Sequence, residues 1–339
     1  MDGDQVELRS LEACLQARLS FDPGDIGPSE NGLKVADALE RFTVEKVVDL
    51  PAFYEGYALL EAQFGPVGEI ERREVLERWF QEGTLSPPED AFQAHYHMAI
   101  ARDRDGRIAG VRDCFCAVQP ELGRVVVLLS HSLVFPEWRR TGISALLRAV
   151  PVPLARRDAH RFGVERPEIL LIAEMDPVEP TVPASLVRLM AYGRGGFAIV
   201  PPWKLPYAQP DFRDLEALAE AARPLPLMWV VRQVGAESAG VLAWEKAVSI
   251  LDGLRAIHTP AVSGPQLAEI RAHALGRKVD SEDAISLIPL PHTPSEFDRI
   301  EPLVRSALYP LYPESWHVRP RGDAQEEIRQ LHDFWKEST

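Results

Sequence analysis

The stretch VFPEWRRTGISALL (Val134–Leu147) decides the fold prediction. It follows the run Arg124–Val134, whose centre is apolar at consecutive positions, as in a strand that is buried on both faces of a sheet. Basic and small residues then form a turn, and an amphipathic helix follows from Gly142. Because the first turn of a helix has unpaired N–H groups and a partial positive charge, this arrangement predicts an anion site.

The residue types in the turn suit a phosphate or pyrophosphate group. Arg139 and Arg140 add positive charge and planar donors beside the predicted anion. Gly142 has no side chain, so we expect it to let a phosphate approach the backbone. Ile143 and Leu147 are expected to hold the helix against the sheet.

The segments on either side of this stretch alternate between strand and helix patterns. Upstream we expect a strand at Phe42–Val48, helices from Pro51 to Phe64 and from Glu69 to Glu82, and strands at His95–Arg102 and Arg107–Val118 joined across Asp105-Gly106. Downstream we expect a strand at Glu168–Ala173, a helix at Ala184–Tyr192, and strands at Phe197–Val200 and Leu227–Val234. This order predicts a mixed α/β fold.

Two motifs resemble the GNAT superfamily of N-acetyltransferases. Arg139–Ser144 matches the family's phosphate signature of Gln or Arg, two residues, Gly, one residue, and Gly or Ala, with Ser144 in the last small position. Tyr192–Phe197 matches a Tyr, three residues, Gly and Phe that end a helix before a strand in this family. The resemblance covers about Phe42 to Val234 and implies an α/β (α+β) acyltransferase fold whose mixed central sheet is mainly antiparallel. Prolines at 151 and 153 and from 177 to 183 depart from the family and leave the detailed shape of the pocket open.

The resemblance implies acetyl-coenzyme A as the co-substrate. Its pyrophosphate would be bound by the turn residues Arg139, Arg140, Thr141, Gly142, Ile143 and Ser144. In this family the pantetheine arm lies beside the strand that precedes the turn, and the matching positions here are Leu133 and Val134.

Amine acetylation also needs proton transfer, because a free alkylamine is mostly protonated at neutral pH. The candidates for a general base are Glu174, at the end of a predicted strand, and His131, whose unperturbed pKa suits proton transfer. By resemblance, Tyr192 is the candidate acid for the departing thiolate. Each has a structural alternative: Glu174 can cap the Pro-rich loop, His131 can be a satisfied buried histidine, and Tyr192 can pack at a helix end.

The reaction class therefore has one main reading and two alternatives. The main one is transfer of an acetyl group to a small-molecule or peptide amine, whose identity stays open. A longer-chain acyltransferase would need a deep apolar channel, which sequence does not measure. A non-catalytic acyl-coenzyme A sensor or partner-binding protein would keep the turn and lack a base.

Bulk properties limit the partners and suggest the domain organisation. The 339 residues exceed the usual length of one domain, and we expect an N-terminal extension (1–41), an acetyltransferase domain (42–235) and a mostly helical C-terminal unit (236–339). In that last unit we expect helices at Val241–Ile257, Gly264–Leu275, Ser295–Leu308 and Asp323–Lys336. The net charge of -14 argues against a nucleic-acid partner and favours a cationic acceptor. With three cysteines, no long apolar run and an acidic start, we expect a soluble cytoplasmic protein without a membrane partner. Many GNAT proteins are dimers, so a homodimer stays open.

One further cluster could hold a metal. If Asp105-Gly106 closes a hairpin, His95 and His97 pair with Cys116 and Cys114, respectively, and all four side chains share one face. Two histidines and two cysteines are a zinc ligand set. A flat hairpin spaces them less compactly than a tetrahedral site requires, so we expect no metal site.

Overall fold

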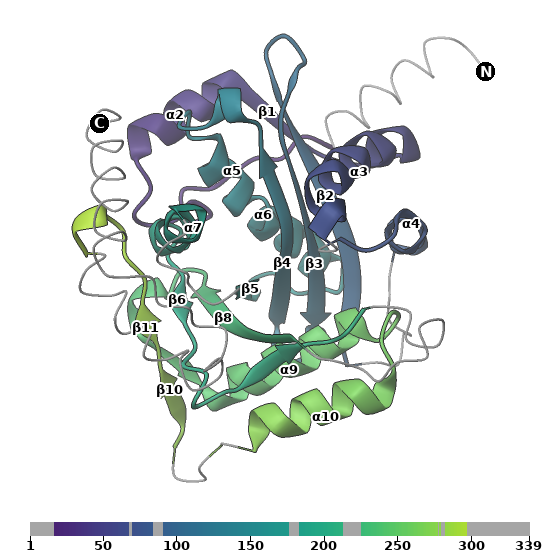
Figure 1. Ribbon diagram of the computed structural model, residues 1–339, viewed down its shortest axis with the longest axis vertical. Helices are drawn as coiled ribbons and strands as arrows, with labels where there is room; N and C mark the ends of the chain where they lie inside the picture. Colours follow the sequence, from purple (N-terminus) through teal and green to yellow (C-terminus); the bar gives the residue numbers. More distant parts are fainter. Residues whose placement is uncertain are drawn as a thin grey trace. The chain divides into compact units, whose positions relative to one another are not determined.

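The computed structural model describes residues 17–67, 70–83, 91–175, 183–212, 225–276, 278 and 282–296 (Figure 1). The chain divides into two compact units. Unit 1 is Met1–Ile26 with Glu30–Pro167, and unit 2 is Gly27–Ser29 with Glu168–Thr339. The boundary after Pro167 thus falls inside the range predicted for one acetyltransferase domain.

Unit 1 contains an antiparallel sheet in the order β1-β2-β3-β4. Its strands are β1 (Phe42–Lys46), β2 (Gln93–Asp103), β3 (Ile108–Gln119) and β4 (Arg124–Val134). The predicted hairpin register is confirmed, because His97 pairs with Cys114 and His95 with Cys116. Between β3 and β4 the register shifts, so that two residues of β4, Ser130 and His131, stand opposite one residue of β3, Asp113.

Helices cover both faces of this sheet. On one face lie α3 (Leu50–Phe64) and α4 (Arg73–Glu82), where Trp79 of α4 packs edge-on against Phe115 of β3 at 5.2 Å between ring centroids. On the other face lie α5 (Ile143–Ala149) and α6 (Pro151–Arg161), as Figure 1 shows behind β4. The helix from Gly142 is interrupted before Pro151, as its prolines predict. Helix α2 (Gly32–Arg41) precedes β1.

Unit 2 contains a second antiparallel group of strands. β5 (Glu168–Met175) pairs with β8 (Leu225–Gln233), and β8 also pairs with β6 (Ala198–Ile199) and β7 (Tyr207–Gln209). β11 (Ile288–Pro289) pairs with β6, and β9 (Val241–Ala243) pairs with β10 (Ala284–Ser286). Its helices are α7 (Pro183–Arg194), α9 (Trp244–His258) and α10 (Gly264–Leu275).

Most expected elements are present. The mixed α/β fold with a mainly antiparallel sheet is confirmed, and α10 has the predicted bounds. The helix expected over Val241–Ile257 was wrong at its start, because Val241–Ala243 pairs with β10 and the helix begins at Trp244. The helix expected at Asp323–Lys336 and nearly all of the one at Ser295–Leu308 lie outside the described residues.

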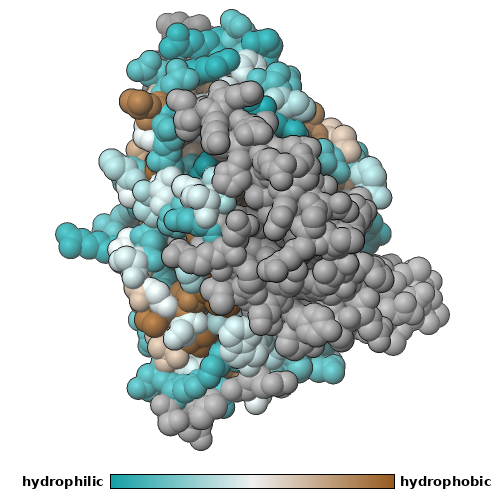
Figure 2. All heavy atoms as spheres, turned by 60° about the vertical axis from the view of Figure 1, so that its left-hand side comes forward, coloured by the Kyte–Doolittle hydropathy of each residue, from teal (hydrophilic) through white to brown (hydrophobic). Residues whose placement is uncertain are grey.

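The described residues that are visible in Figure 2 are largely polar. On the face shown in Figure 2, hydrophilic residues dominate and hydrophobic ones form only small areas. Within the described ranges, no helix combines the length and apolar character that a membrane crossing requires.

Candidate functional site

The turn after β4 has the predicted strand-turn-helix geometry. β4 ends at Val134, the short 3-10 helix Pro136–Trp138 follows, and α5 begins at Ile143. Two residues of the turn have left-handed backbone conformations, Arg140 (φ 69°) and Gly142 (φ 86°). Among the described residues Arg140 is the one non-glycine with positive φ, so the turn holds a conformation that L-residues rarely adopt.

Four consecutive backbone amides in this turn are not engaged within the described structure. Within the described part of the chain, no hydrogen-bond acceptor is found for the N–H groups of Thr141, Gly142, Ile143 and Ser144. A left-handed residue followed by a helical one directs successive N–H groups toward a common point, which is a known anion-binding geometry. The exposed side chains of Arg139 and Arg140 flank these amides.

The opposite side of the turn is covered by helix α2. A β-carbon added to Gly142 would lie 2.2 Å from the carbonyl oxygen of Lys34 and 3.1 Å from the β-carbon of Ala38. Arg148 of α5 also forms an ion pair with Glu30, at 2.5 Å. Glycine is therefore required at 142 by its positive φ and by the close approach of α2. The sequence interpretation, which explained this glycine by phosphate approach, missed both reasons.

A tryptophan fixes the start of the turn. Trp138 is buried and packs edge-on against Phe42 of β1, with 5.5 Å between ring centroids. The guanidinium groups of Arg41 and Arg107 both lie 4.9 Å from its ring centroid. Such cation-π contacts stabilise a partly exposed site by about 0.5–1 kcal/mol each. The turn is thus anchored by residues from α2, from β1 and from the hairpin turn between β2 and β3.

The predicted pantetheine-contacting positions lie at the end of β4. Val134 pairs with Gly110 and Leu133 with Val111, both of β3. A β-carbon on Gly110 would meet the carbonyl oxygen of Leu133 at 2.5 Å, so β3 and β4 lie unusually close here. Leu133 and Val134 are half-buried.

His131 is held by a buried carboxylate. Its Nδ1 lies 3.0 Å from Asp113 Oδ2, and its backbone N–H donates to Asp113 Oδ1 at 2.6 Å. The hydroxyl of Tyr96 donates to the same carboxylate at 3.1 Å. With the proton on Nδ1, the acceptor nitrogen of His131 is Nε2, which is the arrangement of a base oriented by a carboxylate. Burial raises the pKa of nearby Glu71, and His131 opposes that shift.

Glu174 has a different environment, in unit 2. The hydroxyl of Tyr207 donates to its Oε1, and Gln209 Nε2 donates to its Oε2 at 2.7 Å. Both donors lie on β7, so Glu174 ties β7 to β5. A carboxylate with both oxygens engaged is a weaker candidate for a base than His131. Burial and the Glu174 carboxylate raise the pKa of Tyr207, which stays protonated.

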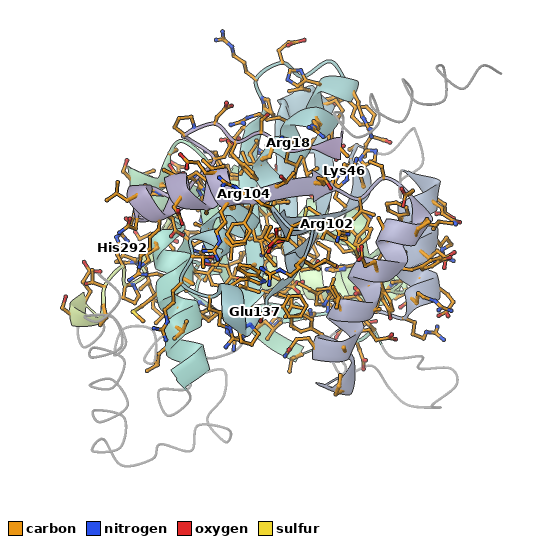
Figure 3. All side chains as sticks on the ribbon, turned by 90° about the horizontal axis from the view of Figure 1, so that it is seen from above. Arg18, Lys46, Arg102, Arg104, Glu137 and His292 are labelled. Atoms are coloured by element: carbon orange, nitrogen blue, oxygen red, sulfur yellow. The ribbon has the colours of Figure 1, made fainter. Side chains whose placement is uncertain are left out.

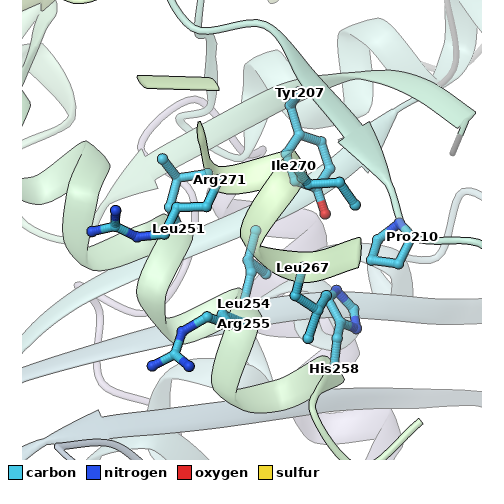
Figure 4. A pocket seen from close by; sticks show the side chains of 9 residues that line it. All are labelled: Tyr207, Pro210, Leu251, Leu254, Arg255, His258, Leu267, Ile270 and Arg271. Carbon is cyan, nitrogen blue, oxygen red and sulfur yellow. The ribbon is translucent and has the colours of Figure 1, made fainter. Parts of the chain in front are cut away.

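A small pocket of about 20 Å³ lies beside this cluster in unit 2 (Figure 4). Tyr207 and His258 are its buried polar residues, and apolar side chains of α9 and α10, including Leu254 and Leu267, line the rest. His258 Nε2 lies 3.9 Å from Glu174 Oε1 and makes no hydrogen bond. Burial lowers the pKa of His258 to about 4, so the ring is neutral at physiological pH.

Tyr192 lies on α7 in unit 2. Its ring packs edge-on against Phe197 at 5.1 Å between centroids, and its carbonyl accepts the Phe197 N–H at 3.0 Å. Glu174 and Tyr192 belong to unit 2, whereas His131 belongs to unit 1. Sequence reasoning missed the partners Asp113 and Tyr207, although an aspartate inside an apolar strand is a signal that could have been followed.

Comparisons with known proteins were made for the whole chain. No protein-family model matches it, and no curated protein matches it. Solved structures of acetyltransferases match the chain. An aminoglycoside acetyltransferase from an uncultured soil metagenomic sample is 19% identical, over 41% of this chain and 81% of that one, with a TM-score of 0.28.

Two further structures carry the GNAT name. An acetyltransferase of the GNAT family from Staphylococcus aureus is 8% identical, over 56% of this chain and 99% of that one, with a TM-score of 0.32. A GNAT superfamily phosphinothricin acetyltransferase from Sinorhizobium meliloti, in complex with acetyl-coenzyme A, is 13% identical, over 58% and 91%, with a TM-score of 0.31. These identities and scores are too low to assign an activity. The chain is thus similar to acetyltransferases of the GNAT superfamily, the family that its two sequence motifs resemble.

Proposed function

We propose that this chain is an N-acetyltransferase of the GNAT type, which binds acetyl-coenzyme A at the turn between β4 and α5. The observation that carries the proposal is the row of four amides from Thr141 to Ser144 that lack acceptors in the described chain, beside the exposed Arg139 and Arg140. A pyrophosphate accepts several hydrogen bonds and is stabilised by neighbouring guanidinium groups. The pantetheine arm would then run along Leu133 and Val134.

For the chemical step we propose His131 as the general base. Asp113 orients the ring and stabilises the imidazolium that forms when His131 takes a proton from the attacking amine. Attack on the thioester carbonyl gives a tetrahedral oxyanion, whose collapse releases coenzyme A thiolate. Tyr192 is proposed as the acid that protonates this thiolate, on the strength of its motif. The acceptor is an amine, and the net charge of -14 favours a cationic one.

The coenzyme site is tested best at Ser144, because this residue is exposed in the first turn of α5. Ser144→Glu places a carboxylate within about 5 Å of the proposed pyrophosphate, where each pair of charges repels by about 1 kcal/mol in water and about 3 kcal/mol at a protein surface. Acidic residues are favourable in the first turn of a helix, so folding should not suffer. Ser144→Gln is the matched neutral control.

Calorimetric titration with acetyl-coenzyme A should show binding by the original chain and by Ser144→Gln, and at least about tenfold weaker binding by Ser144→Glu. Equal affinities for the two variants would place the pyrophosphate elsewhere. If the original chain binds, a panel of amines is screened by the release of free thiol. Binding without thiol release for any amine would favour the sensor alternative.

A further inference from the structure

A second cluster of reactive side chains lies in the interior of unit 1, apart from the groups used above. His95 and His97 of β2 share a face with Cys114 and Cys116 of β3, and all four are buried. Asp158 of α6 lies against this face and is 1% exposed. One ligand atom each of His97, Cys116 and Asp158 lie within 4.8 Å of one another.

The distances within the cluster are short. His97 Nε2 lies 2.5 Å from Asp158 Oδ2, and His95 Nδ1 lies 3.8 Å from the same oxygen. The two imidazole rings are stacked, with 6.4 Å between their centroids. His97, Cys116 and Asp158 thus bring three metal-binding groups together from two strands and a helix, and His95 lies beside them.

Several of these polar atoms lack hydrogen bonds. In the described structure His95 Nδ1, His97 Nδ1 and Asp158 Oδ1 are buried without a hydrogen-bond partner. Buried polar groups are normally paired, and an unpaired one costs about 1–3 kcal/mol. An ion beside Asp158 could engage the unpaired atoms of His95 and Asp158, whereas His97 would bind it through Nε2, the nitrogen that faces Asp158.

The structure supplies the ligand that the hairpin lacks. A flat pair of strands cannot surround an ion, and on that ground the sequence predicted no metal here. Asp158 lies on α6, which packs on this face of the sheet, so the ligands do not all lie along the hairpin. Tetrahedral ligands at about 2.0–2.3 Å from zinc are separated by roughly 3.3–3.8 Å. His97 and Asp158 would separate slightly from their present hydrogen bond, and Cys116 would move closer.

We propose that His95, His97, Cys116 and Asp158 form a structural zinc site. The ligand types are two imidazoles, a thiolate and a carboxylate, a combination of N, S and O donors that suits zinc. One thiolate and one carboxylate balance the double positive charge, so the filled site is neutral, as a buried centre should be. Zinc joins β2, β3 and α6 and thereby stabilises the core of unit 1.

The charged neighbours are compatible with this site. Arg161 Nη1 lies 3.7 Å from Asp158 Oδ1, and the Arg161 side chain is mostly exposed, so it can turn toward water. Lys46 of β1, labelled in Figure 3, is half-buried, and its pKa is lowered by burial, partly offset by Asp158. Burial raises the pKa of the Cys116 thiol, so zinc binding must release the thiol proton. The hydrogen between His97 Nε2 and Asp158 moves to His97 Nδ1, so that Nε2 can bind zinc as a neutral imidazole.

The proposal is tested by metal content and by a spectroscopic probe. The full chain is purified from zinc-supplemented cells without a chelator, and its zinc is measured by mass spectrometry; about one zinc per chain is expected. After the zinc is removed, cobalt(II) alone is titrated in. The expected spectrum has a thiolate-to-cobalt charge-transfer band and the intense visible bands of four-coordinate cobalt. Less than about 0.1 zinc per chain, together with no cobalt spectrum, overturns the proposal.

A matched pair of variants tests the ligand assignment. Cys114 and Cys116 lie two residues apart on β3, and both are fully buried. Cys116→Ala should lose stoichiometric zinc and the charge-transfer band, whereas Cys114→Ala should keep both. The reverse outcome, or retention of zinc by both variants, contradicts the assignment. Should Cys116→Ala fail to fold, Asp158→Asn provides the second variant, and the metal content of the original chain decides by itself.

Discussion

Replacement of Gly142 by alanine should destabilise unit 1 more than alanine does at a left-handed glycine with open space around it. The left-handed conformation (φ 86°) costs an L-residue about 1–2 kcal/mol. The new β-carbon would also lie 2.2 Å from the Lys34 carbonyl oxygen, which belongs to the backbone of α2 and cannot rotate away. Moving α2 adds an overpacking cost of about 1–3 kcal/mol. The expected loss is therefore about 2–5 kcal/mol in the free energy of unfolding.

The control for this prediction is Gly163→Ala. Gly163 also lies in unit 1 and has φ 76°, but an added β-carbon would meet nothing within 4 Å. It should therefore lose only about 1–2 kcal/mol. The difference in the free energy of unfolding is measured by urea unfolding of both variants, with circular dichroism as the signal and a constant m-value. Equal losses would show that α2 does not pack on the turn.

Three further predictions concern single side chains. His131→Asn should lower kcat for acetyl transfer, measured by thiol release, about 10²–10⁴-fold. The Kd of acetyl-coenzyme A, measured by calorimetry, should change less than about threefold. An unchanged kcat would exclude His131 as the base. Tyr192→Phe should lower kcat at unchanged stability if the hydroxyl is the acid, and should leave kcat unchanged if the ring only packs. His258 has a pKa of about 4 in the fold, so the unfolded chain binds more protons between pH 6.5 and 4, and stability falls as the pH falls through this window. His258 should lower the free energy of unfolding by about 3 kcal/mol between pH 7 and pH 4. His258→Leu should lack this contribution when urea unfolding is measured from pH 7 to 4. An identical pH dependence of the two chains would refute the assignment.

Local patterns predicted most of the secondary structure. The sequence predicted a buried strand at Arg124–Val134, then a basic turn and a helix with one apolar face. The structure agrees with this prediction. The hairpin register around His97 and Cys114 agrees with the one predicted from a two-residue Asp105-Gly106 turn. The turn itself is longer, because the Asp103 N–H donates to the Arg107 carbonyl, and a register shift between Ala101 and Arg102 restores the predicted pairing.

Contacts between distant segments could not be read from the sequence. Nothing in the local pattern of α2 indicates that Lys34 covers Gly142, and nothing near His97 points to Asp158, which lies 61 residues away. Val241–Ala243 was expected to be helical, and pairing with β10 outweighs its local preference. Glu174 ranked first as a base from its position at a strand end, but the donors on β7 that engage it were not visible in sequence.

The central claim is that the amides of Thr141–Ser144 bind the pyrophosphate of acetyl-coenzyme A. Hydrogen-deuterium exchange of the full chain, with and without saturating acetyl-coenzyme A, measures these amides directly. Peptides that cover residues 139–147 should exchange more slowly when the ligand is bound, because free N–H groups then acquire acceptors, and Ser144→Glu should lose this protection. Unchanged exchange over 139–147, under conditions where calorimetry shows that the ligand is bound, would contradict the account.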